Sequence, residues 1–98
     1  MGDDGAISDD SRLIVPDHVL SRRVGDETVL LNLDNEQYYG LDGVGARFWE
    51  IAEDGTTFKQ AVDVLQAEYA VERDVLVTDL NVIVLDLRMN GLLSVDAA

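Results

Sequence analysis

The sequence predicts an α+β domain in which three strands precede three helices. Between residues 18 and 41, apolar and polar side chains alternate in short segments bounded by turn residues, as they do in strands. From residue 42 onward, apolar residues recur every three or four positions, as they do on one face of a helix. Strands grouped before helices favour an α+β fold over an alternating α/β fold.

The predicted strands cover three segments, residues 18–24, 27–33 and 36–41. Gly25 and Asp26 supply a turn between the first two strands. Asp34 and Asn35, both tolerant of left-handed backbone angles, supply a tight turn between the second and the third. Residues 27–41 are therefore predicted to form a hairpin.

Two adjacent tyrosines, Tyr38 and Tyr39, lie in the third predicted strand. Successive side chains of a strand point to opposite faces, so only one of the two rings can face the core. Tyr39 shares a face with Leu41, and Tyr38 shares the other face with Gly40. Alternation is compatible with either tyrosine facing inward. If this strand lies at the sheet edge, its free N–H and C=O groups can accept a peptide as an extra strand.

The first two helices have recognisable ends. Asp42 is a suitable N-cap for the first helix, and Gly55 ends it. Thr57 and Gln60 have the spacing of a capping box, which predicts the start of the second helix at Phe58.

The third helix is predicted over residues 73–90, with Gly91 as its C-terminal stop, and it carries two apolar stripes. The wider stripe predicts the core face and consists of Leu76, Val77, Leu80, Ile83, Val84 and Leu87. The second stripe consists of Val75, Val82, Leu85 and Met89. A surface helix needs only one apolar face, so the second stripe either touches another part of the core or lines an exposed groove for a partner.

Length and charge restrict the function classes. A chain of 98 residues forms one small domain, and we predict a disordered acidic tail over residues 1–12 and the folded domain over residues 13–98. The net charge of −13, with only seven Lys and Arg, argues against binding to nucleic acid or to anionic membranes. There is no signal-peptide pattern and no apolar run long enough to span a bilayer, so we expect a cytoplasmic protein.

The sequence predicts no catalytic, cofactor or metal site. Cysteine is absent, which excludes a thiolate nucleophile. His18 is the only histidine, and the cluster of Glu50, Glu53 and Asp54 is more typical of a solvated helix face than of an acid/base pair. We therefore expect a protein that is not an enzyme.

A series of short motifs resembles the PqqD family, named after the pyrroloquinoline-quinone biosynthesis protein. In chain order the motifs are Leu31 to Leu33, Tyr38-Tyr39-Gly40-Leu41, Val44-Gly45, Phe48-Trp49-Glu50, Gly55-Thr56-Thr57, Asp79-Leu80, Ile83-Val84, Leu87 and Gly91-Leu92-Leu93. The resemblance covers about residues 18–95. It is strongest to the free-standing members found with lasso-peptide biosynthesis.

The resemblance implies a winged helix-turn-helix-like fold, with a three-stranded antiparallel sheet followed by three helices. Members of the family bind the N-terminal leader of a ribosomally made precursor peptide. The leader adds an antiparallel strand to the third strand, and its apolar side chains enter the groove beside the third helix. In lasso systems the precursor is then presented to a separate cysteine protease, and a cyclase closes the ring afterwards.

Carried onto this chain, the resemblance assigns leader binding to eight residues. The main-chain ladder would come from Gln37, Tyr38, Tyr39 and Gly40. The groove would be lined by Val75, Asp79, Val82 and Asp86. An acidic groove would favour leaders that carry Lys or Arg.

Two other functions compete with leader binding. Winged helices often bind DNA, but the third helix carries only Arg73 and Arg88 as cations, and its aspartates would face phosphates. A general acidic interaction protein, or an antitoxin-like one, is compatible with the composition.

Overall fold

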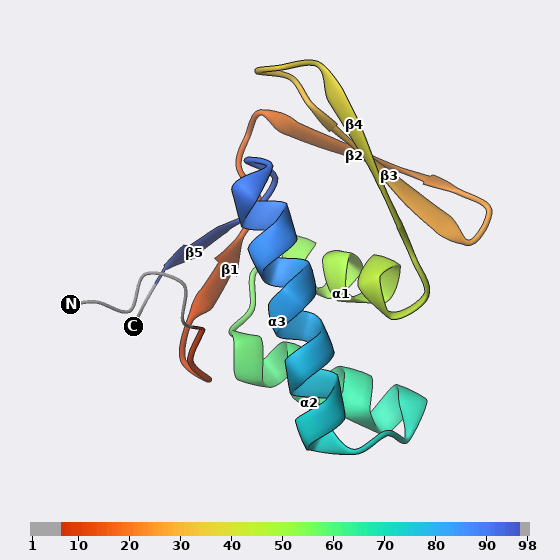
Figure 1. Ribbon diagram of the computed structural model, residues 1–98, viewed down its shortest axis with the longest axis vertical. Coiled ribbons are helices and arrows are strands. Elements are labelled where there is room, and N and C mark those ends of the chain that lie inside the picture. Colours follow the sequence, from red (N-terminus) through yellow and green to blue (C-terminus); the bar gives the residue numbers. More distant parts are fainter. Residues whose placement is uncertain (1–6, 97–98) are drawn as a thin grey trace.

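The computed structural model describes residues 7–96 and confirms the predicted α+β class (Figure 1). A three-stranded antiparallel sheet is followed by three helices, and a second, two-stranded sheet joins the two ends of the described chain. The elements are β1 (Arg12–Ile14), β2 (Val19–Val24), β3 (Glu27–Asn32), β4 (Gln37–Asp42), α1 (Gly43–Glu53), α2 (Phe58–Tyr69), α3 (Arg73–Met89) and β5 (Ser94–Asp96).

The main sheet has the order β2-β3-β4, and β4 leads directly into α1 (Figure 1). The register pairs Leu30 with Tyr39, as expected for a hairpin. The residue with left-handed backbone angles in the connecting loop is Glu36, with φ of 61°, rather than Asp34 or Asn35. The side chains of the neighbouring asparagines explain the difference, because Asn32 accepts from the Asp34 N–H and Asn35 accepts from the Gln37 N–H, both at 2.9 Å.

The two-stranded sheet was not expected from the sequence. β1 pairs antiparallel with β5, with Leu13 opposite Val95. The segment before β1 is also held in place, because Ser11 is buried and its carbonyl accepts from the Phe58 N–H at 2.8 Å. The structure therefore differs from the expected tail at residues 7–12, while residues 1–6 lie outside the described range. Three-residue strands that pair across the whole chain leave no local periodicity to detect.

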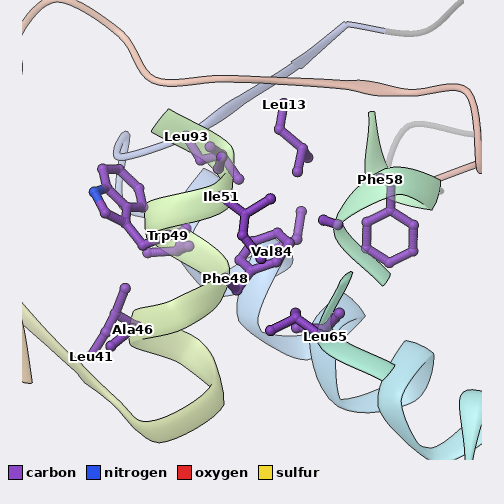
Figure 2. Packing of buried hydrophobic residues seen from close by; sticks show 14 of the residues in the cluster. Leu13, Leu41, Ala46, Phe48, Trp49, Ile51, Phe58, Leu65, Val84 and Leu93 are labelled. Carbon is purple, nitrogen blue, oxygen red and sulfur yellow. The ribbon is translucent and has the colours of Figure 1, made fainter. Parts of the chain in front are cut away.

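The core lies mainly among the three helices, and it includes Leu13 of β1, Leu93 after α3, and Leu30 and Leu41 of the main sheet (Figure 2). From α1, the side chains of Phe48 and Trp49 are fully buried, which confirms a core role for the single tryptophan. Burying each such large side chain contributes about 1.5–3 kcal/mol. The wider stripe of α3 faces this core as predicted, with Leu76, Leu80, Val84 and Leu87 buried and Val77 and Ile83 partly buried.

The capping box at the start of α2 is confirmed. The Gln60 N–H donates to the Thr57 hydroxyl at 3.2 Å, and the Thr57 N–H donates to the Gln60 side chain at 3.1 Å. Asp42 occupies the N-cap position of α1 with an extended backbone, but its side chain makes no capping hydrogen bond. The Asp42 carboxylate therefore remains available at the junction of β4 and α1.

Helix α3 ends in a Schellman motif around Gly91. The Gly91 N–H donates to the Arg88 carbonyl at 3.1 Å, and the Leu92 N–H donates to the Leu87 carbonyl at 2.8 Å. Gly91 has φ of +71°, which L-residues with a Cβ adopt only with strain. The turn directs Leu92 and Leu93 back into the core, where both are buried.

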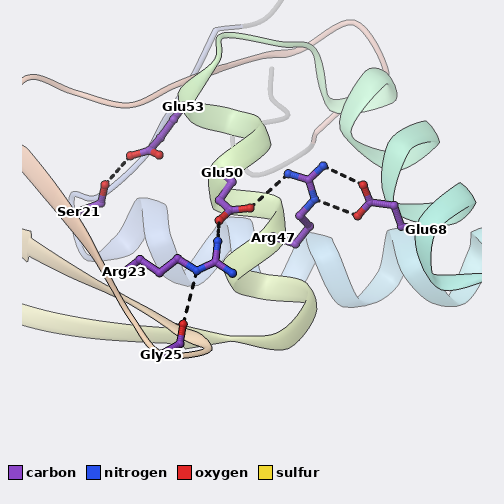
Figure 3. Close-up of polar contacts among 7 residues, drawn as sticks. All are labelled: Ser21, Arg23, Gly25, Arg47, Glu50, Glu53 and Glu68. Atoms are coloured by element: carbon purple, nitrogen blue, oxygen red, sulfur yellow. Dashed lines mark hydrogen bonds and ion pairs between the residues drawn. The ribbon is translucent and has the colours of Figure 1, made fainter.

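An ion-pair network connects β2, α1 and α2 (Figure 3). Arg47 donates to both carboxylate oxygens of Glu68, at 2.9 and 2.8 Å, and also contacts Glu50, which pairs with Arg23. Hydrogen bonds from Arg47 hold the pKa of Glu68 below its usual range. The bidentate pair fixes the spacing of α1 and α2 from outside the core.

Replacing Gly91 by Ala should lower the free energy of unfolding by about 1–2 kcal/mol, because a non-glycine residue is strained at a left-handed angle. The new Cβ would also lie 3.0 Å from the Asn32 amide nitrogen, which donates to the Asn90 carbonyl. Urea unfolding followed by circular dichroism measures the change. Gly40→Ala is the matched control, because a Cβ at Gly40 meets no atom within 4 Å, and it should change stability by less than about 0.5 kcal/mol. Equal stabilities of the two variants would contradict this account.

Candidate functional site

Strand β4 is paired on one edge only. Within residues 7–96 it pairs with β3, and no other strand lies against its second edge. β4 is six residues long and enters α1 directly (Figure 1), and its Tyr39 contacts Asp86 of α3. An unpaired edge presents free N–H and C=O groups, which can pair with another chain.

The register shows which main-chain groups face the open edge. The Leu33 N–H donates to the His18 carbonyl at 2.8 Å, so the main chain of Leu33 faces β2. Because these groups alternate along a strand, Asn32 and Leu30 face β4, and the residues opposite them, Gln37 and Tyr39, face β3 in return. Of the four predicted ladder residues, Tyr38 and Gly40 therefore direct their N–H and C=O groups outward. The main chain of Tyr39 faces β3, and the Gln37 N–H donates to the Asn35 side chain, so neither is directed to the open edge.

The two tyrosines lie on opposite faces of β4, and the structure decides which one is inward. Tyr39 packs against the core on the same face as Leu41, and its hydroxyl donates to the Asp86 carboxylate on α3 at 2.6 Å. Tyr38 is 71% exposed on the outer face of the sheet. Tyr39 is therefore the ring that connects β4 to α3.

The contact with Asp86 changes the proton affinity of Tyr39. The hydrogen bond to the carboxylate, together with partial burial and the negative charge of Asp86, raises the pKa of Tyr39 from 10.0 to about 12. The neutral phenol is the form that donates this bond, so the bridge between β4 and α3 is complete at neutral pH.

The second stripe of α3 is exposed, which answers the question that the sequence left open. Its four side chains are between 50% and 76% exposed, and they are Val75, Val82, Leu85 and Met89. None of them belongs to the core cluster. The stripe is therefore an apolar surface that the fold itself does not cover.

Part of this stripe lines a groove of about 460 Å³ between α3 and the junction of β4 with α1. The α3 side and the segment before it contribute Val71, Val75, Leu76, Asp79, Val82 and Ile83. The opposite wall is formed by Asp42, Gly43, Val44 and Gly45. A Cβ on Gly45 would lie 3.4 Å from Leu41 and 3.7 Å from Ile83, so these three residues meet beside the groove.

Three of the four α3 residues predicted for the site line this groove, and the fourth does not. Val75, Asp79 and Val82 line the groove together, whereas Asp86 lies one turn further on, where it accepts from Tyr39. The wall from Asp42 to Gly45 was not predicted as part of the site. The feature of the sequence that could have indicated this wall is the pair Gly43 and Gly45, because residues without side chains leave space beside the first turn of α1.

The groove is apolar with an acidic margin. Its lining includes the carboxylates of Asp42 and Asp79 and no basic residue. Neither carboxylate takes part in an ion pair within residues 7–96. A ligand with a cationic side chain next to an apolar one would complement this surface.

Two further hollows have a different character. One of about 500 Å³ lies on the outer face of the main sheet, and its lining includes Leu20, Val29, Leu31 and Tyr38. The other, of about 610 Å³, surrounds the paired charges of Arg23, Arg47 and Glu50. We place the candidate site in the groove because it combines a free strand edge, an exposed apolar stripe and unpaired carboxylates.

The described part of the chain offers little for other chemistry. No group of three or more His, Asp or Glu side chains within it could hold a metal ion. The only histidine, His18, lies 2.8 Å from the Gly91 carbonyl through its Nε2. None of the helices in residues 7–96 has the length and apolarity needed to cross a membrane.

Raising the pH should break the bridge between β4 and α3 through Tyr39. Because the folded protein holds this proton more tightly than the unfolded chain does, the contribution of the bridge to stability is complete below pH 10.0 and is lost as the pH rises to about 12. Ultraviolet absorbance of tyrosinate measures the titration. Tyr39→Phe should remove the step near pH 12, and a step that persists in this variant would contradict the assignment.

Comparison with known proteins identifies relatives with the same fold. The family model described as "Coenzyme PQQ synthesis protein D (PqqD)" matches residues 27–93, which is more than half of the chain. A search of the curated proteins found no match.

Two solved structures resemble this protein. TbiB1, solved in complex with the TbiA(β) leader peptide, has 39% sequence identity and a TM-score of 0.78, and the match covers 82% of this chain and 93% of TbiB1. A lasso peptide synthetase B1, solved in complex with the leader peptide, has 23% identity and a TM-score of 0.75, with 84% and 96% of the two chains covered. The second likeness supports the fold, and the first, together with the family model, shows that this chain belongs to the PqqD family.

Proposed function

We propose that this protein binds the leader segment of a ribosomally synthesised lasso precursor peptide and presents it to a separate cysteine protease. The leader would add an antiparallel strand to the open edge of β4 and place alternate side chains in the groove beside α3. The observation that carries this proposal is the combination of that unpaired edge with an exposed apolar stripe directly next to it.

The free energy of leader binding can be estimated from the contacts that the open edge and the groove would make. Each main-chain hydrogen bond to Tyr38 or Gly40 would contribute about 0.5–1.5 kcal/mol net. Each leader side chain buried in the groove would contribute about 1.5–3 kcal/mol. Ordering a flexible leader costs about 2–5 kcal/mol or more. The sum corresponds to a dissociation constant in the micromolar range or somewhat below.

The charges of the groove favour leaders with basic residues. Asp42 and Asp79 lie in its lining without an ion-pair partner in the described part of the chain, while Asp86 accepts from Tyr39. A leader Lys or Arg beside Asp79 would gain an ion pair next to an apolar surface that excludes part of the water. Asp79 is therefore the groove carboxylate that we expect to select for a cation.

The protein would act without catalysing a reaction itself. These 98 residues contain no cysteine, so they do not supply the nucleophile of a cysteine protease. Its role would be to raise the local concentration of the precursor at the protease and to hold the leader extended, which lowers the entropy lost at the cleavage step.

Titration of a fluorescent leader peptide tests the proposal. The leader of the precursor encoded beside this gene should bind saturably with a dissociation constant of about 10 μM or lower. Fluorescence anisotropy measures the binding, and the TbiA(β) leader, which the similar TbiB1 binds in its structure, serves as a second probe. Absence of saturable binding by the protein's own leader would overturn the proposal.

Replacing Val82 by Glu should weaken leader binding about tenfold or more, because a docked peptide would bury an unpaired charge. The domain should stay folded, with a change in stability below about 0.5 kcal/mol, because Val82 is 64% exposed. Val64→Glu is the matched control, since Val64 is an exposed helical valine on α2 that lies outside the groove lining.

The same two variants test whether leader binding in the groove is needed for presentation of the precursor to the protease. In an assay with the partner protease, the unmodified protein and Val64→Glu should accelerate removal of the leader, and Val82→Glu should not. Equal acceleration by both variants would show that the groove does not take part.

A further inference from the structure

Tyr39 lies beyond one end of the groove, whose lining on α3 stops at Val82 and Ile83. Along β4 and the start of α1, the wall formed by Asp42 to Gly45 faces Val75, Asp79 and Val82, and the bridge from Tyr39 to Asp86 follows one helical turn later. On the other side of the Tyr39 ring there is only a small hollow of about 50 Å³, lined by Asn32, Gln37, Tyr38, Tyr39, Asn90 and Leu92. Tyr39 therefore lines the small hollow, whereas the large groove begins on the side of Leu41 and the start of α1.

The alternation of a docked strand determines which peptide side chains reach these chambers. In an antiparallel pair, side chains directly opposite each other point to the same face of the sheet. A peptide residue opposite Leu41 would therefore point toward the groove of about 460 Å³. The inward-pointing residue two positions further along the peptide would lie opposite Tyr39 and meet its ring.

The ring is held against displacement by its hydroxyl. Tyr39 is partly buried against the core, and its hydroxyl donates to a charged acceptor at 2.6 Å. Bonds of this kind are stronger than those between neutral groups. A bulky peptide side chain opposite Tyr39 would have to break this bond or move the peptide off the edge of β4.

From these observations we propose that Tyr39, held by Asp86, is a specificity-determining residue of the leader site. The groove accepts a large aliphatic side chain at the peptide position opposite Leu41, and the Tyr39 ring restricts the position opposite Tyr39 to small side chains. This inference rests on the proposed leader binding and adds to it the size pattern of the leader strand, large and small at two inward positions separated by one residue.

A tryptophan scan of the leader tests this pattern. Each position of the synthetic leader of the neighbouring precursor is replaced singly by Trp, and binding is measured by fluorescence anisotropy. With the unmodified protein, Trp at the position opposite Tyr39 should weaken binding about tenfold or more, because the side chain overfills the space left by the ring.

Variants of the bridge between Tyr39 and Asp86 identify that peptide position directly, whatever the register of the leader on β4. In Tyr39→Ala, the Trp penalty should fall to less than about threefold at one position only, because the enlarged space accommodates the indole. Asp86→Ala, which frees the ring without removing it, should lower the penalty at the same position. Tyr69→Ala is the control, because Tyr69 is an exposed tyrosine on α2 outside the groove lining, and it should leave every penalty unchanged.

The outcomes separate this inference from the proposed function. One outcome is that the unmodified leader binds while Tyr39→Ala lowers the Trp penalty at no position, or lowers it equally at all positions. In either case Tyr39 does not select side chains, so the inference is wrong while leader binding stands. Relief in Tyr39→Ala without relief in Asp86→Ala would disprove the role of the bridge. Binding of the unmodified leader to each variant confirms that it is folded. If the unmodified protein binds no leader, both proposals fail together.

Discussion

The open edge of β4 is the constraint on which the rest of the site depends. A strand exposes a row of hydrogen-bonding groups on each edge, and β3 satisfies only one of these rows. No further strand pairs with the second row within residues 7–96. Tyr38 and Gly40 direct their main chains there, and the exposed stripe of α3 lies along the same side. An extended peptide could form hydrogen bonds with the free edge of β4 and at the same time bury the exposed apolar stripe of α3.

The net charge restricts the class of ligand that this surface could bind. A domain of net charge −13 repels phosphate backbones and anionic surfaces over a distance set by ionic strength. The same charge attracts a basic peptide and raises its rate of encounter. Near the groove, Asp86 is bonded to Tyr39, whereas Asp42 and Asp79 are free of ion pairs in the described chain. The acids of this surface thus differ in their contacts, and in the proposed function the two without an ion pair would meet the basic residues of a leader.

The sequence predicted most of the fold because periodicity and helix-end signals are local. The hairpin, the capping box at Thr57 and the stop at Gly91 all depend on residues within one or two turns of each other. The pairing of β1 with β5 depends on segments at opposite ends of the chain, so it left no such signal. For the site, helical spacing predicted the second stripe of α3, and the resemblance to the PqqD family assigned Val75, Asp79, Val82 and Asp86 to a groove. The wall from Asp42 to Gly45 was missed because small residues reveal a groove only when its opposite side is known.

The sequence by itself determined that Tyr38 and Tyr39 lie on opposite faces and that α3 has two apolar stripes, since both follow from the fixed periods of strands and helices. Only the tertiary structure decided that Tyr39 is the inward ring and that the second stripe is exposed. It also decided that the main chain of Tyr39 bonds to β3 while that of Tyr38 faces the open edge. A period specifies which residues share a face, but the elements packed against that face decide what it contacts, and these come from distant parts of the chain.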